Sequence, residues 1–188
     1  MISKKNVLVV GVTGLAYFLL FELNNALFTS FSFSTGVNWI FLPSGLRLAF
    51  ILVFGLWGAV GIALASFIIN LLFYFDGSFV TSVGTGLISG FGPLLARAIC
   101  VDLIKLDVDL KNLGAGTLLK VAVIFAVLSP MLHQAWFTLR GQTENFIHST
   151  AVMVVGDLTG TLVVLYVAKF LLGLAPGFAA NSTQDSRY

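Results

Sequence analysis

Long apolar stretches that contain almost no charged side chains make up most of this chain. Each is close to the roughly 20 residues that one helix needs to cross the hydrocarbon core of a bilayer. Only 10% of the 188 residues are charged and 58% are hydrophobic, whereas a soluble domain has about 25% charged residues. So few charges cannot cover a soluble globule. The chain is therefore predicted to be an integral membrane protein, which excludes a soluble enzyme, a nucleic-acid binder and a disordered chain.

The apolar stretches predict an all-α, polytopic bundle of about six transmembrane helices. Residues 22–38 mix polar side chains with phenylalanines and are predicted to lie at the membrane interface or to re-enter it. Gly55 and Leu56 leave room only for a tight turn, so the second and third helices are expected to form an antiparallel hairpin. The transmembrane domain is expected to take in residues 1–174, followed by a flexible cytoplasmic tail, 175–188. The predicted spans are residues 7–21, 39–54, 57–75, 80–101, 117–139 and 150–172.

The distribution of basic residues predicts which side of the membrane each end faces. Cytoplasmic loops of membrane proteins are enriched in lysine and arginine. With six spans and a cytoplasmic N-terminus, the outer side holds only Arg140. We therefore expect both termini on the cytoplasmic side. The basic residues on that side are then Lys4, Lys5, Lys105, Lys111, Lys120, Lys169 and Arg187.

Three charged residues, Arg47, Arg97 and Asp157, lie inside apolar stretches. Each would cost about 2.5–3.5 kcal/mol at the centre of a bilayer if it had no partner, so pairing or access to water is required. One interpretation is a structural salt bridge between Asp157 and one arginine. The other is a polar cavity in which the second arginine is free to bind a small polar or anionic ligand. Arg97 lies near the predicted inner end of its helix, where its side chain can extend to the interface.

Other polar groups in the spans are weaker candidates for a site. Ser44 follows Pro43, and a helix that restarts there would present free N–H groups to an anion, although a proline at a helix start is also a common cap. His133 and Gln134 lie within one span, and Glu22 ends the first one, where it can close the mouth of a cavity. With two histidines and one cysteine, we expect no metal site, no cofactor and no catalytic residue.

Two segments resemble the MASE1 family of bacterial membrane sensor domains. They are Phe41-Leu42-Pro43-Ser44-Gly45-Leu46-Arg47-Leu48, followed by Gly55-Leu56-Trp57-Gly58-Ala59-Val60-Gly61 and Asn70, and Gly156-Asp157-Leu158-Thr159-Gly160. In the family a proline follows the tryptophan, where this chain has Gly58, and family domains usually have about eight spans. The resemblance covers less than half of the chain.

The MASE1 resemblance implies a sensing or docking module in a bacterial inner membrane. Family members are normally fused to cytoplasmic signalling domains, so this chain is expected to signal through a separate membrane or cytoplasmic partner protein. The module is expected to have no enzymatic activity.

Two other functions fit the same sequence. A chain of this length with six spans is similar to the substrate-binding subunits of energy-coupling-factor transporters, which implies a small-molecule transport subunit. A structural or assembly subunit of a larger membrane complex is the third interpretation. All three place the chain in the lipid bilayer, and none involves nucleic acid.

Overall fold

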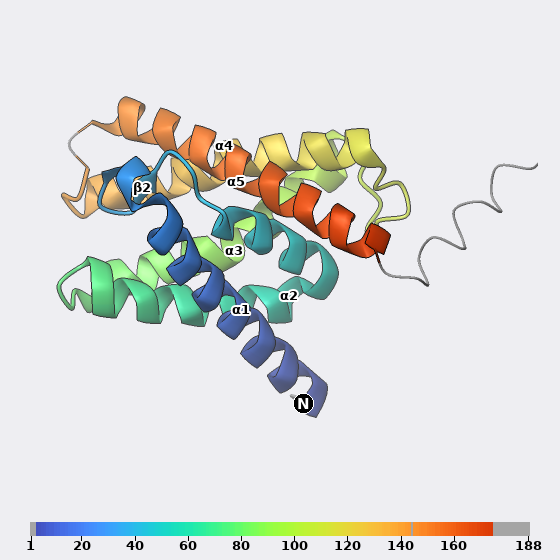
Figure 1. Ribbon diagram of the computed structural model, residues 1–188, viewed down its shortest axis with the longest axis horizontal. Helices are drawn as coiled ribbons and strands as arrows, with labels where there is room; N and C mark the ends of the chain where they lie inside the picture. Colours follow the sequence, from blue (N-terminus) through green and yellow to red (C-terminus); the bar gives the residue numbers. More distant parts are fainter. Residues whose placement is uncertain (1–2, 144, 175–188) are drawn as a thin grey trace, which may run out of the picture.

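The computed structural model describes residues 3–143 and 145–174 and consists almost entirely of helices (Figure 1). The described residues contain five helices that are long and apolar enough to cross a membrane. This confirms the predicted all-α class and agrees with a multi-pass membrane protein. The predicted tail, 175–188, lies outside the described residues. The helices are α1 (Lys4–Phe28), α2 (Pro43–Ile69), which continues into the π-helical turn η2 (Asn70–Tyr74), α3 (Phe79–Leu103), α4 (Ala115–Leu139) and α5 (Phe146–Leu174).

Helix α2 reverses its direction at Gly55. This residue has φ 55° and ψ −129°, a backbone conformation that glycine adopts without a steric penalty. The ring of Phe21 lies 6.0 Å from that of Phe41, just before α2, and 5.6 Å from that of Tyr74, at the end of η2. A straight helix over this length would separate its ends by more than about 40 Å. The turn therefore lies where the sequence predicts it, and α2 consists of two arms, 43–54 and 56–69.

The connection between α1 and α2 differs from the prediction. Helix α1 continues past Glu22 to Phe28, so much of the predicted interfacial segment is helical. A 3₁₀ turn, η1 (Thr29–Phe31), and two short antiparallel strands, β1 (Ser32–Ser34) and β2 (Val37–Asn38), follow it.

The second predicted span begins as irregular, non-helical chain, and α2 starts only at Pro43. Backbone N–H groups of this irregular chain find acceptors within the protein. Phe41 donates to the carbonyl of Gly156, and Leu42 donates to the side-chain oxygen of the buried Asn24. Such partners are required wherever irregular backbone lies among membrane helices. A proline at the first helical position costs no hydrogen bond, because that N–H would have no helical partner.

Glycines allow α5 to approach the chain of residues 38–41, before α2, closely. A Cβ added at Gly160 would collide with the carbonyl oxygen of Phe41, and one added at Gly156 with that of Asn38. Gly86 and Gly90 of α3 approach the backbone of the second α2 arm in the same way. Small residues allow this close backbone contact between membrane helices.

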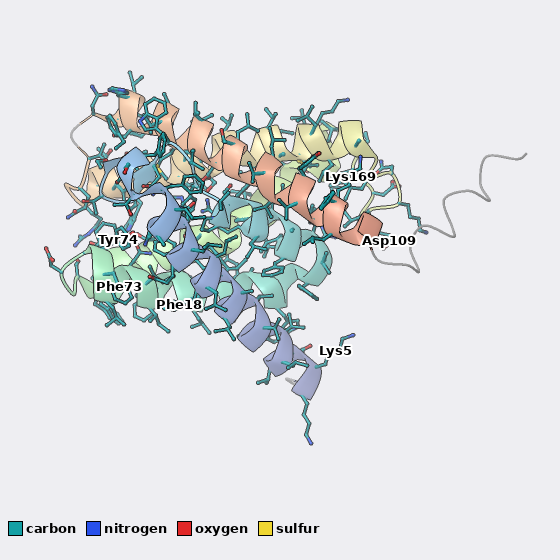
Figure 2. The ribbon with its side chains drawn as sticks, in the orientation of Figure 1. Lys5, Phe18, Phe73, Tyr74, Asp109 and Lys169 are labelled. Carbon is teal, nitrogen blue, oxygen red and sulfur yellow. The ribbon has the colours of Figure 1, made fainter. Side chains whose placement is uncertain are left out.

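Charged residues and aromatic residues are labelled at opposite ends of the bundle in Figure 2. In Figure 2, the labelled Lys5, Asp109 and Lys169 lie toward the right, and Phe73 and Tyr74 lie toward the left. The N-terminal end of α1 and the C-terminal end of α5 therefore belong to the same end of the bundle, which also holds the α3–α4 connection (Figure 1).

Gly160→Ala is expected to destabilise the protein, because the new methyl group has no space beside the Phe41 backbone. Overpacking of this kind costs about 1–3 kcal/mol. Gly11→Ala is the matched control, since nothing lies within 4 Å of a Cβ at Gly11 in α1. Thermal unfolding in detergent, followed by fluorescence-detected size exclusion, should show a lower midpoint for Gly160→Ala alone. Equal midpoints for the two variants would contradict this packing.

Candidate functional site

Arg47 and Asp157 form a buried ion pair at the centre of the bundle. Arg47 belongs to the first arm of α2 and Asp157 to α5. The Arg47 Nη2 atom donates to both carboxylate oxygens, at 3.0 Å to Oδ1 and 2.9 Å to Oδ2. Both side chains are 2% exposed. Each charge offsets part of the cost of burying the other, and the pair joins two elements that are far apart in the sequence.

The rest of the Arg47 guanidinium is only partly satisfied. Its Nη1 donates to the hydroxyl of Ser129 in α4 at 3.3 Å, and the rings of Phe41 and Phe125 lie 5.3 and 5.4 Å from its central carbon. These distances permit cation–π attraction. Its Nε is buried and has no hydrogen-bond partner. Arg47 therefore holds three elements together and still has donor capacity left.

The segments that carry the MASE1 resemblance lie directly against each other. The Ser44 hydroxyl donates to the backbone carbonyl of Asp157 at 2.9 Å and lies 2.8 Å from the hydroxyl of Thr161. The N–H groups of Ser44 and Gly45 donate to the carbonyls of Phe41 and Leu42. The N–H groups of Ser44 and Gly45 at the start of α2 thus have acceptors within their own chain and are not free to bind an anion.

A chain of hydrogen bonds leads from α2 to His133 in α4. The side-chain amide of Asn70 donates to Ser66 at 3.2 Å, Ser66 donates to Ser89 at 2.9 Å, and Ser89 lies 3.2 Å from His133 Nε2. His133 Nδ1 donates to the backbone carbonyl of Ser129 at 2.9 Å. Ser129 connects this chain to the ion pair, because its carbonyl accepts from His133 and its hydroxyl accepts from Arg47. His133 is therefore part of the same polar network as Arg47.

Three predicted site residues lie elsewhere. Arg97 donates to the carbonyl of Val108, in the α3–α4 connection, at 2.7 Å and to that of Ile51 in the first α2 arm at 3.4 Å, and it does not join the ion pair. Gln134 is buried, with its amide nitrogen 2.9 Å from the sulfur of Met153. Glu22 is exposed on α1. Of the two arginines, it is Arg47 that pairs with Asp157, because it lies deeper in the bundle.

A small cavity lined by both polar and apolar side chains lies next to the ion pair, with a volume of about 40 Å³. By the rule that one water needs about 10–15 Å³, it has room for about three waters. Among residues 3–143 and 145–174, no three His, Cys, Asp or Glu side chains are grouped to hold a metal ion. The cavity is lined by Arg47, Ser66, Asn70, Ser89 and His133 from the network, with Tyr17, Phe21, Gly36, Asn38, Phe41, Tyr74, Thr85, Phe137 and Met153.

Most neutral members of this network, among them Ser66, Ser89 and Ser129, are not predicted from the sequence. Serine is frequent in membrane helices, so single positions carry little signal. Two pairs have a spacing of four residues, Ser66 with Asn70 and Ser129 with His133, which places both members on one helix face. That spacing is the signal that points to a polar face within each span.

Comparisons of the chain with protein-family models, with curated proteins and with solved structures find no match.

Arg47→Met is expected to destabilise the protein by about 3–5 kcal/mol, because Asp157 is left as an unpaired buried charge. The double variant Arg47→Met and Asp157→Leu should recover most of this loss, since an apolar pair of similar volume replaces the ion pair. Unfolding free energies from SDS titration in mixed micelles measure both.

Arg97→Met is the matched control, since its guanidinium reaches a loop carbonyl rather than a buried charge. It should cost clearly less than Arg47→Met. A double variant as unstable as the sum of the Arg47→Met and Asp157→Leu single variants would show that the two side chains are not coupled.

Proposed function

We propose that the chain is a MASE1-like sensing module in a bacterial inner membrane, without enzymatic activity, that passes its signal to a separate partner protein. The observation that carries this proposal is the contact between the two MASE1-like segments through Arg47, Asp157 and Ser44. A polar cavity lies beside this contact and shares Arg47 with it.

The polar network provides a physical route from the cavity to the rest of the bundle. Arg47 contacts a cavity ligand from the first α2 arm and holds Asp157 of α5 and Ser129 of α4. A ligand that draws the guanidinium toward it changes the relative positions of these elements. A ligand shifts a conformational equilibrium only when it binds one arrangement of the helices more tightly than the other.

Cavity size favours sensing over transport. Sites for vitamin-sized ligands have volumes of roughly 300–1,000 Å³, whereas this cavity has about 40 Å³. The helix surfaces away from the core carry apolar side chains such as Leu72 and Leu119, 65% and 50% exposed, as contact with lipid requires. The cavity beside Arg47, where buried polar groups converge, is therefore small.

The proposal includes six membrane crossings with both termini on the cytoplasmic side. The reversal at Gly55 supports two crossings within α2. The first arm has only 12 helical residues, about 18 Å at 1.5 Å per residue, and the non-helical residues 39–42 precede it in the same crossing. Lys105, Lys111 and Lys169 then lie at the cytoplasmic end, and Arg140 lies at the opposite end.

Cysteine labelling of intact cells tests the six crossings. In a Cys100→Ala background, single cysteines at Phe33, Asp76 and Gln142 are expected to react with a membrane-impermeant maleimide, and one at Lys111 only after lysis. A single crossing of α2 would place Phe33 and Asp76 on opposite sides of the membrane. Labelling of only one of these two positions would therefore contradict the reversal as a pair of crossings.

Photo-crosslinking in native membranes tests for the signalling partner. A benzoylphenylalanine at Val108, 67% exposed in the α3–α4 connection, is expected to capture one defined protein. The same probe at Ile147, 79% exposed at the opposite end of the bundle, is the matched control. Asp157→Asn should lower the yield at Val108 several-fold at equal expression, because it weakens the network. Lipid adducts alone at both positions would contradict a partner-coupled module.

A further inference from the structure

We infer that the cavity beside Arg47 binds a small uncharged molecule of about two to four non-hydrogen atoms that carries an acceptor oxygen, such as a primary amide or a small alcohol. This inference rests on the proposed sensing function and specifies the chemistry of what is sensed. Three observations carry it: the unused donors of Arg47, the balance of charge at the cavity, and its volume.

Arg47 has more N–H donors than the protein supplies with acceptors. A guanidinium has five N–H groups, and the protein offers Arg47 three acceptor atoms, the two oxygens of Asp157 and the hydroxyl of Ser129. Its Nε has none. A buried donor without an acceptor is costly and uncommon in native proteins. A ligand oxygen in the adjoining cavity supplies an acceptor for the same guanidinium.

The charge balance selects an uncharged ligand. Among the described residues that line the cavity, Arg47 is the one arginine or lysine, and none is an aspartate or glutamate. The charge of Arg47 is already balanced by Asp157 at 2.9 Å. A bound anion would have to compete with Asp157, and a bound cation would find no free carboxylate. Both cost more in a low-dielectric interior than a neutral dipole of the same size.

The volume and the hydroxyl groups that line the cavity define the rest of the ligand. About 40 Å³ holds roughly three water-sized groups, which excludes a sugar or a nucleotide. Tyr17, Ser66 and Ser89 also line the cavity and carry hydroxyl groups. Ser66 and Ser89 donate their hydroxyl hydrogens within the network, so their oxygens are left as acceptors for a ligand. A molecule with a carbonyl or hydroxyl oxygen for Arg47 and an N–H or O–H for these oxygens satisfies both sets of groups.

Formamide and formate provide a matched pair of probes, since they have the same number of non-hydrogen atoms and differ in charge. Saturation-transfer NMR on the full chain in nanodiscs is expected to show saturable binding of formamide with a Kd of a millimolar or weaker, as the affinity ceiling per ligand atom requires. Formate should bind at least about ten-fold more weakly. Equal binding of the two probes, or no saturable binding of formamide, would overturn the inference.

Variants locate the binding. Arg47→Lys keeps a cation for Asp157 but removes the planar array of donors, and Tyr17→Phe removes only one hydroxyl from the wall. Each should weaken formamide binding several-fold, and Tyr17→Phe keeps the test valid if Arg47→Lys fails to fold. Ser82→Ala is the matched control, because this buried hydroxyl also has no partner but does not line the cavity. Unchanged binding in both Tyr17→Phe and a folded Arg47→Lys would overturn the assignment.

The binding experiment and the crosslinking experiment test different proposals. Partner capture at Val108 without formamide binding would support the sensing module and contradict the proposed class of ligand. Saturable formamide binding without partner capture would support the class of ligand and contradict the proposed partner.

Discussion

The buried ion pair between Arg47 and Asp157 is the interaction on which the centre of this bundle depends. Two charges in an apolar interior are tolerated only when they satisfy each other. Here the pair connects the first arm of α2 to α5, and Ser129 adds α4. Because a displaced partner leaves an uncompensated charge, the pair specifies which elements are neighbours as well as stabilising their contact.

Close backbone packing makes this pair possible. The irregular chain before Pro43 contacts α5 at Gly156 and Gly160, where any side chain would collide with a carbonyl. The Phe41 N–H uses the Gly156 carbonyl as its acceptor. This contact brings the start of α2 to the level of Asp157. The reversal at Gly55 then returns the second arm beside α1 and α3, so that Ser66 and Asn70 reach the same cavity as Arg47.

The cavity is the consequence of placing polar groups from several helices around one guanidinium. Apolar side chains fill space between helices efficiently, whereas a polar network constrained by hydrogen-bond geometry leaves small gaps. A gap with donors and acceptors on its walls is suited to a polar occupant and unsuited to lipid. This combination of a buried charged pair and a small space lined by polar groups distinguishes the centre of the bundle from its apolar outer surface.

The sequence alone determined the class of protein, most helix positions and the turn at Gly55. Each follows from local physics: apolar length, charge density and the conformational freedom of glycine. It also identified Arg47 and Asp157, because charges in apolar stretches require an explanation. It did not determine that Arg97 would reach the α3–α4 connection, that Glu22 would lie exposed on a longer α1, or that Ser66, Ser89 and Ser129 would join His133. Those outcomes depend on which helix faces meet, and only the tertiary structure decides contacts between residues as far apart as Arg47 and Asp157.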